Sequence, residues 1–353
     1  MNRRITGGEP RVRGSHPPLW LPWRPAHLRA DEGARHFSRL DIPWRLHARI
    51  NSARRFALVA VAAFELTEVV VLWRRGFGSQ EWMPLVLGAL VLLLLLGFEL
   101  AEAAATRRER ELALEIAEWL IPRVSPSIPH LEVAFSVRRM ERVAGDYFSI
   151  VPRWSNSEDG GAHRVFVTMA DVAGLGMQGA LLMATFQASL RALADTRMPL
   201  GDLAAQLNRW SWDRSREGRH FVMGFFADLQ PETGEIKYVN AGHQPPLLLR
   251  ADGHAESLES GGIPLGVQAQ TGYEVGSAVM APGESLVIFT DGAAGARDHR
   301  GEPFGAERIR QVLENIGQCS SSEVLDLILT SVLSFAGSAH QEDDISVLVL
   351  KRV

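Results

Sequence analysis

Two long apolar runs constrain the fold of this 353-residue chain more than any other feature. FALVAVAAFELTEVVVLW covers Phe56–Trp73, and MPLVLGALVLLLLLGFEL covers Met83–Leu100. Each run is close to the length of about 20 residues with which a helix crosses a bilayer. The second run carries no charge before Glu99, so it is unsuited to a soluble helix. We therefore expect a transmembrane helical hairpin over residues 56–100.

The first apolar run also contains two acidic residues. Glu65 and Glu68 are three positions apart and share one helical face. Carboxylates in lipid are costly and usually face a partner helix or are protonated. A buried helix of a soluble domain is the alternative for this run. Trp73 and Trp82 bracket the connection between the runs, as an aromatic belt does at a membrane surface.

The basic residues predict the orientation of this hairpin. Arginines before and after the hairpin outnumber those between its helices. They are Arg45, Arg49, Arg54 and Arg55 before it, Arg107, Arg108 and Arg110 after it, and Arg74 and Arg75 between its helices. Because positive charge accumulates on the cytoplasmic side, we expect a two-pass membrane protein with cytoplasmic N- and C-termini.

Composition excludes several other classes. Residues 1–55 are rich in Arg, Pro and His without periodicity and lack the early apolar core of a signal peptide, so we expect a disordered cytoplasmic segment. The C-terminal half has no basic patch interleaved with aromatic residues, which argues against nucleic-acid binding. Cys319 is the only cysteine, so no intramolecular disulfide or Cys-ligated zinc site forms. No Arg follows Cys319 at the loop spacing of a Cys-based phosphatase.

A charged segment follows the hairpin. TRRERELALEIAEWLIP has helical periodicity until Pro122, so we expect a helical linker over residues 101–122. Leu112, Ile116 and Trp119 share one face of this helix. That face could pair with a second copy of the chain, and we expect a homodimer, although one or two heptads define a coiled coil only weakly.

The pattern changes at Leu131 to short β-like runs separated by Gly, Pro and Asp. The runs are LEVAFSV, RVFVTMADV, FVMGFFADLQ, EIKYVNAG, PPLLLR, SLVIFTDG and DISVLVLKRV. Two helical patterns, Gly179–Ala194 and Leu200–Arg214, lie among them, and ADLQPETGEIKYV indicates a hairpin. Many strands with inserted rather than alternating helices predict an α+β layered fold over residues 123–353.

The stretch GLGMQG, which begins at Gly174, has the G-x-G-x-x-G spacing of a dinucleotide-binding turn. That fold also requires a second strand and an acidic residue about 20 positions on. Asp195 lies at this distance, but GALLMATFQASLRALAD is one uninterrupted helical pattern. The sequence therefore disfavours NAD binding.

Aspartates occupy four predicted strand ends instead. Asp171 ends VFVTMA, Asp146 lies in AGDYFSIV, and Asp291 lies in LVIFTDG. Asp343 and Asp344 precede the last strand. Each alone is often a turn residue. If the strands converge, the carboxylates repel one another and are best stabilised by divalent cations, among which hard oxygen ligands favour Mg²⁺ or Mn²⁺.

Six ordered blocks of the sequence resemble one family. They are ERVAGDYFSIV, VTMADVAGLGMQGALLMATF, FVMGFFADLQPETGEIKYVNAGHQPPLLLR, GGIPLGV, LVIFTDGAAGARDHRGEPFG and DDISVLVLKRV. In order and spacing they are similar to the SpoIIE-type, RsbU-like bacterial metal-dependent serine/threonine protein phosphatases of the PPM superfamily. The resemblance covers about Leu112 to Val353. It implies an α-β-β-α sandwich with a two-metal site at one edge. The two apolar runs described above would tether this domain to a bacterial cell membrane.

The resemblance also implies roles for individual residues. Asp146 should bridge two Mn²⁺ or Mg²⁺ ions. Asp171, with the backbone carbonyl of Val172, should hold one ion, and Asp291 and Asp343 should hold the other. The helix after the glycine turn corresponds to the regulatory switch region of the family.

Four positions depart from the family pattern. Ala144 stands where a first glycine is usual, Ser149 where a second Asp is frequent, Leu175 where His is common, and Gly295 where Glu is usual. None is a predicted metal ligand, but these changes could weaken metal affinity or the switch. We interpret His243 in NAGHQPP, and the glycines of GGIPLG, as structural rather than catalytic.

The resulting hypothesis is a membrane-anchored phosphatase that hydrolyses phosphoserine or phosphothreonine on a protein with a metal-activated water. The resemblance implies a STAS-type anti-sigma-factor antagonist as the substrate, in bacterial partner-switching or stress signalling. One alternative is a catalytically silent binding scaffold at the membrane, which would not need all four aspartates. Another is a nucleotide phosphatase, although no Gly-Lys pair of a Walker loop occurs.

Overall fold

The computed structural model describes residues 60–64, 66–67, 69–71, 74, 82–122, 124–139, 145–153, 164–173, 176–194, 196, 198–215, 220–316, 319–339, 341 and 343–353. The chain divides into two compact units, Met1–Ala101 and Glu102–Val353. Some expectations lie outside the described residues: disorder over residues 1–55, and the positions Glu65, Glu68, Trp73, Ala144 and Leu175.

The longest helix contains the second apolar run. α3 (Trp82–Leu120) is one uninterrupted helix of 39 residues, so it also contains the expected linker up to Leu120. Pro122 follows its end, and a proline disfavours helical conformation in the residue before it. Among the described residues, Leu85–Leu120 is the one segment long and apolar enough to cross a membrane, judged by length and composition. The first helix of the hairpin is described only in part, so the hairpin stays a prediction.

The second unit contains two sheets. The first sheet has the order β1 (Leu131–Arg138), β11 (Ile345–Arg352), β10 (Ser285–Phe289), β6 (Leu247–Leu249) and β7 (Ala255–Ser257). The second sheet has the order β2 (Asp146–Arg153), β3 (Arg164–Val172), β4 (Val222–Gln230), β5 (Glu235–Ala241) and β8 (Gly261–Gly262), and β9 (Gly276–Val279) also pairs with β5. The β5–β8 pair is parallel, whereas the pairs of long strands are antiparallel.

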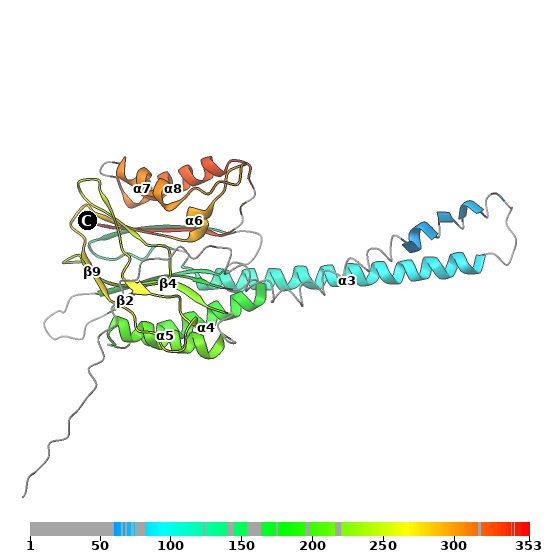
Figure 1. Cartoon of the computed structure of the whole chain (residues 1–353), viewed down its shortest axis with the longest axis horizontal. Helices are drawn as coiled ribbons and strands as arrows, with labels where there is room; N and C mark the ends of the chain where they lie inside the picture. Colours follow the sequence, from blue (N-terminus) through cyan, green and yellow to red (C-terminus); the bar gives the residue numbers. More distant parts are fainter. Residues whose placement is uncertain are drawn as a thin grey trace, which may run out of the picture. The chain divides into compact units, whose positions relative to one another are not determined.

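Helices cover the outer face of each sheet (Figure 1). α4 (Gly176–Ala194) and α5 (Leu200–Arg214) pack on the second sheet through β3, β4 and β5. α7 (Ala306–Glu314) and α8 (Ser321–Ala336) pack on the first sheet, and the short α6 (Asp291–Gly295) follows β10. The unit therefore has the α+β layered fold that the sequence pattern predicts, in the α-β-β-α order that the family resemblance implies.

Alternating strand side chains fill three apolar layers. In β3, Val167 and Met169 face the layer between the sheets, whereas Phe166 and Ala170 face α4 and α5. A third layer, which includes Phe289, lies between the first sheet and helices α7 and α8. Because the centre of β3 is buried on both faces, its sequence does not alternate between apolar and polar residues, and Thr168 is the one polar residue from Val165 to Ala170.

Most of the predicted elements agree with the structure. ADLQPETGEIKYV forms β4, a turn and β5, and Gly234 in this turn has a φ of 75°, which glycine adopts without strain. α4 continues to Ala194 without a break, so no strand of a dinucleotide fold interrupts it. The patterns above did not indicate α7 and α8, although a capping box of Ser320 and Glu323 marks the start of α8.

The layer between the sheets should dominate the stability of the second unit. Leu348→Ala is expected to lower the free energy of unfolding by about 2–5 kcal/mol, because Leu348 is fully buried there and its truncation leaves a cavity. Leu327→Ala removes the same atoms from an exposed position of α8 and should cost less than about 1 kcal/mol. Urea unfolding of the Glu102–Val353 fragment measures both changes, and equal costs would contradict this assignment of the core.

Candidate metal centre

β2 and β3 bring the first two aspartates together. Their antiparallel register places Asp146, the first residue of β2, opposite Asp171 near the end of β3. The carbonyl of Gly145 accepts a hydrogen bond from the N–H of Val172 (3.2 Å). A Cβ at Gly145 would lie 2.1 Å from the carbonyl oxygen of Val172. The glycine therefore allows the close approach of the two strand ends where Val172 presents its carbonyl.

β10 and β11 bring the other aspartates to the edge of the first sheet. Asp291 begins α6 just after β10, and Asp343 and Asp344 lead into β11. β10 and β11 are adjacent antiparallel strands, so the end of one lies beside the start of the other. A Cβ at Gly292 would lie 1.9 Å from the backbone oxygen of Asp344. The start of α6 thus packs directly on the segment that carries the aspartate pair.

A hydrogen-bonded bridge connects the two sheets at this edge. Oδ2 of Asp146 accepts hydrogen bonds from Oγ1 of Thr290 (2.9 Å) and from Oγ of Ser346 (2.5 Å). The N–H of Thr290 donates to the carbonyl of Ser346 (3.0 Å), and the N–H of Ser346 donates to Oγ1 of Thr290 (3.2 Å). All three residues are buried. The aspartate of the second sheet is thereby fixed to the first sheet.

Burial and a neighbouring charge change the pKa of the Asp146 carboxyl. Burial raises the pKa of its carboxyl well above the ordinary value, and the charge of Asp171 raises it further. The hydrogen bonds from Ser346 and Thr290 favour the charged carboxylate and oppose this shift. The carboxylate is therefore oriented by its donors but electrostatically disfavoured.

Burial and neighbouring aspartate charges also raise the pKa values of carboxyls from both sheets. Burial, followed by the charges of Asp291, Asp343 and Asp344, raises the pKa of Asp171 to about 7. Burial and the charge of Asp343 likewise raise the pKa of Asp291. The carboxylates of the four predicted ligands therefore repel one another, and bound divalent cations would reduce this repulsion.

The donor set fits divalent metal ions by its chemistry. Aspartate carboxylates and a backbone carbonyl are the hard oxygen ligands that Mg²⁺ and Mn²⁺ prefer. Asp146 is buried and Asp343 is exposed, so the set extends from the interior to the surface. In the part of the chain that the structure describes, no three His, Cys, Asp or Glu side chains already form a finished metal site.

Asp344 is a buried carboxylate that the sequence hypothesis did not include among the ligands. It is only 2% exposed, and its charge acts on both Asp146 and Asp171. Its signal in the sequence is the position of the DD pair directly before a buried strand, where alternate residues face opposite sides. Asp343 therefore lies toward solvent and Asp344 toward the interior.

His243 has the structural environment that the sequence predicts. Its backbone N–H donates to Oδ1 of Asn240 (2.8 Å), and its Nδ1 forms a hydrogen bond with the carbonyl oxygen of Gln244 (2.7 Å). Burial lowers the pKa of the imidazole to about 4. The ring is therefore neutral and holds the turn after β5 in place.

Two of the positions that depart from the family pattern are described. Ser149 is buried in β2 and, by strand alternation, lies on the face opposite to that of Asp146. Gly295 ends α6, and a Cβ there would meet no atom within 4 Å. Neither residue alters the carboxylates that face one another.

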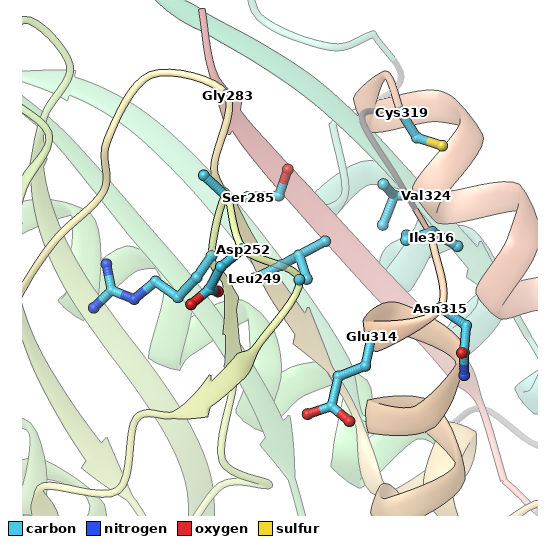
Figure 2. A pocket seen from close by; sticks show the side chains of 12 residues that line it. Leu249, Asp252, Gly283, Ser285, Glu314, Asn315, Ile316, Cys319 and Val324 are labelled. Atoms are coloured by element: carbon cyan, nitrogen blue, oxygen red, sulfur yellow. The ribbon is translucent and has the colours of Figure 1, made fainter.

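A cavity of about 330 Å³ lies elsewhere in this unit (Figure 2). Its lining includes Asp252, Glu314, Cys319 and Ser285, the last of which begins β10. The acidic cluster lies at the opposite end of that strand, where Asp291 follows it. This cluster consists of Asp146, Asp171, Asp291, Asp343 and Asp344. The cavity is thus separate from the predicted metal ligands.

The layered sheets and the carboxylates at their edge define a phosphatase domain of the PP2C, or PPM, type. The chain belongs to the SpoIIE family: residues 161–353 match the family described as Stage II sporulation protein E (SpoIIE). The match includes Asp171, Asp291 and Asp343, and it begins after Asp146.

Known proteins share this fold at low sequence identity. The SiaA-PP2C domain of Pseudomonas aeruginosa is 17% identical with a TM-score of 0.57, over 72% of this chain and 98% of that chain. The RsbU and RsbW domains of a Mycobacterium tuberculosis protein are 23% identical with a TM-score of 0.52, over 64% of this chain and 61% of that chain.

Two curated relatives are similar over most of the chain. Protein IcfG of Synechocystis sp. is 23% identical over 272 residues, which cover 70% of this chain but only 42% of IcfG. Phosphoserine phosphatase RsbU of Bacillus subtilis is 25% identical over 248 residues, which cover 70% of both chains.

The close packing at Gly292 gives a test of the observed edge. Gly292→Ala is expected to lower the free energy of unfolding by about 1–3 kcal/mol, because the added methyl overlaps the backbone oxygen of Asp344. Gly295→Ala, three residues later in α6, is the matched control and should change it by less than about 0.5 kcal/mol. Urea unfolding of both variants measures the difference. If Gly292→Ala is as stable as the control, the two segments do not pack as described.

Proposed function

We propose that the second unit hydrolyses phosphoserine or phosphothreonine esters on a protein substrate, with two Mn²⁺ or Mg²⁺ ions. The observation that carries this proposal is that four aspartates from four strand ends lie close enough for their charges to add to the effect of burial and raise the pKa values of Asp146, Asp171 and Asp291. The fourth aspartate is Asp343. Membership of the SpoIIE family supports it, as does the similarity to a relative named phosphoserine phosphatase.

The chain's own residues hold and orient the reacting groups. When bound, two divalent cations activate a water molecule and neutralise the charge of the phosphoryl group. Asp146 would hold both ions, and the hydroxyls of Thr290 and Ser346 keep its carboxylate in one orientation. Asp171 with the carbonyl of Val172 would hold one ion.

The open side of the cluster receives the substrate. Asp291 and Asp343 would hold the second ion, and Asp343 is exposed, so the phosphoester approaches from its side. Water rather than a side chain is the nucleophile, so no phosphorylated form of the enzyme arises. The buried carboxylates stay unprotonated when ions offset their charge, which leaves them free to bind rather than to donate protons.

The substrate class that we propose is a STAS-type anti-sigma-factor antagonist. Such a protein carries the phosphoserine or phosphothreonine in partner-switching pathways that regulate sigma factors. The similarity to RsbU of B. subtilis supports this choice, and so does the similarity to a structure that contains RsbU and RsbW domains.

A catalytically silent scaffold is the second candidate. Gly295, in the position where the family usually has Glu, favours this candidate. The buried orientation of Asp146 favours the enzyme, because a scaffold gains nothing from the repulsion among these carboxylates.

We further propose that residues 56–100 anchor the chain in a bacterial cell membrane as a two-pass hairpin, with residues 1–55 and the phosphatase domain (residues 123–353) in the cytoplasm. α3 has 39 residues, which at 1.5 Å per residue is about 58 Å, whereas a bilayer core is about 30 Å thick. Its charged half, which begins at residue 101 and ends at Leu120, therefore lies outside the lipid and forms most of the linker, residues 101–122.

We also propose that this linker pairs two copies of the chain. Leu112 and Trp119 are exposed on α3, and Trp119 is 72% exposed. Ile116, the third residue of the expected face, is partly buried against the α4–α5 layer, so the free face is narrower than the sequence suggested. A strictly monomeric full-length protein in both detergent and nanodiscs would contradict the dimer.

Phosphate release tests the catalytic proposal. The Glu102–Val353 fragment should release phosphate from phosphoserine peptides with Mn²⁺ or Mg²⁺ and not with EDTA. Asp171→Asn and Asp291→Asn should each reduce kcat/KM by at least about 100-fold, because each removes a charged metal ligand. Asp326→Asn, an exposed acid on α8, is the matched control and should retain activity. Metal binding without turnover in the wild type would favour the scaffold.

Thiol labelling in intact cells tests the topology. In a Cys319→Ser background, a membrane-impermeant maleimide should modify Ser79→Cys, between the two apolar runs, because that connection lies outside the cell. Ser322→Cys, an exposed position at the start of α8, should react only after the cells are permeabilised. Labelling of Ser322→Cys in intact cells would reverse the proposed orientation.

A further inference from the structure

Two side chains hold the last turns of α3. The final four carbonyls of a helix have no partner within the helix. The guanidinium of Arg139, just after β1, donates from Nη2 to the carbonyl of Ala117 (2.7 Å) and from Nη1 to that of Leu114 (3.4 Å). Gln187 on α4 donates from Nε2 to the carbonyl of Leu120 (3.4 Å). The side chains of Ala113 and Ala117 are fully buried, so this end of α3 is packed as well as hydrogen-bonded.

Arg139 also lies beside the acidic cluster. The register of β1 and β11 pairs Arg138 with Ile345, so the next residue, Arg139, follows β1 on the side of Asp344. Gln341 connects the same segments, because its Nε2 donates to the carbonyls of Arg138 (3.2 Å) and of Asp343 (2.6 Å). The end of β1 is thus tied to the segment that carries the aspartate pair.

Carboxylates of α3 and of the acidic cluster both contribute to the electrostatic environment of Arg139. Burial lowers the pKa of its guanidinium, and the carboxylates of Asp344, Glu118 and Asp146 oppose this shift. Glu118 belongs to α3, whereas Asp344 and Asp146 belong to the acidic cluster. The hydrogen bonds to α3 and the position next to the segment of Asp344 therefore place this one cation between the linker helix and the site.

The planar guanidinium makes this connection geometrically strict. Its donors form a rigid fork, so the positions of two carbonyls on α3 determine where its charge lies. A compact ammonium group could follow either partner alone. A displacement of the last turns of α3 would therefore move the positive charge relative to Asp146 and Asp344.

We propose that Arg139 is a positioning residue that couples the last turns of α3 to the carboxylates of the metal centre. The hydrogen bonds to Leu114 and Ala117 hold the guanidinium against α3. The pairing of β1 with β11 places Arg139 next to the segment that carries Asp343 and Asp344, so the position of α3 would affect how these carboxylates are arranged for metal binding. The inference rests on the proposed metal-dependent function and assigns the linker contact to one side chain.

Full-length protein in nanodiscs provides the test, with the variants Arg139→Gln and Arg139→Lys and the matched control Arg138→Gln, whose side chain is exposed. Calorimetry measures the Kd for Mn²⁺, and hydrogen exchange measures residues 114–122 and 343–347. Arg139→Gln should speed exchange in both segments and weaken Mn²⁺ binding about tenfold, as loss of an outer-shell partner does. Arg139→Lys should give a smaller effect of the same sign, and Arg138→Gln should match the wild type.

The direction of the affinity change distinguishes positioning from simple charge. Removal of a positive charge beside carboxylates would by itself tighten Mn²⁺ binding. Faster exchange in residues 114–122 alone, with unchanged or tighter Mn²⁺ binding, would reduce Arg139 to a helix cap and overturn the proposal. If Arg139→Gln does not fold, the same two measurements on Arg139→Lys decide. If wild-type protein binds no Mn²⁺, the proposed function fails, and the exchange data alone then decide whether the two segments are coupled.

Discussion

The hydrogen bonds from Thr290 and Ser346 to Asp146 join the two sheets at the edge where the acidic residues gather. A buried carboxylate without donors carries a large desolvation penalty, and these two hydroxyls offset part of it. Thr290 lies between β10 and Asp291, and Ser346 lies in β11, three residues after Asp343. The arrangement of the site therefore depends on how the sheets are stacked and not on any single loop.

The buried and mutually repelling carboxylates at this edge lower the stability of the domain. Asp146, Asp171 and Asp291 all have pKa values raised by burial and by their neighbours, so each would be more stable in a dispersed arrangement. The three apolar layers stabilise the fold against this repulsion, and bound cations would remove its cause. A site that costs stability in the absence of its ligand is typical of functional centres rather than of structural ones.

The fold was predictable where burial leaves a periodic or continuous apolar pattern. β3, β4 and β11 are long and mostly buried, and their sequences show it. β7 and β8 have three and two residues, which is too short for any pattern. α7 has nine residues and no cap from a side chain, so its signal is weak.

The candidate site was predictable only in part. Periodicity shows which residues share a face of one element, but it does not show which strands are neighbours. The convergence of Asp146 with the aspartates of the first sheet follows from sheet order and stacking, and only the family resemblance implied it. The hydrogen bond from Thr290 to Asp146 was not predicted. The hydrogen bonds from Arg139 to α3 span 22 and 25 residues and have no signal in the sequence.

The pairing of β1 with β11 has a consequence for biosynthesis. β1 is the first strand of the domain to leave the ribosome, and it pairs along its whole length with the last, from Leu131 with Arg352 to Arg138 with Ile345. β10 pairs with β6 on one side, and its other edge stays unpaired until β11 has been synthesised. On a nascent chain the backbone N–H and C=O groups along these edges are unpaired, which makes both strands prone to wrong pairing. Ser346 also emerges late, so the carboxylates cannot assemble into a working centre until synthesis of the domain is complete.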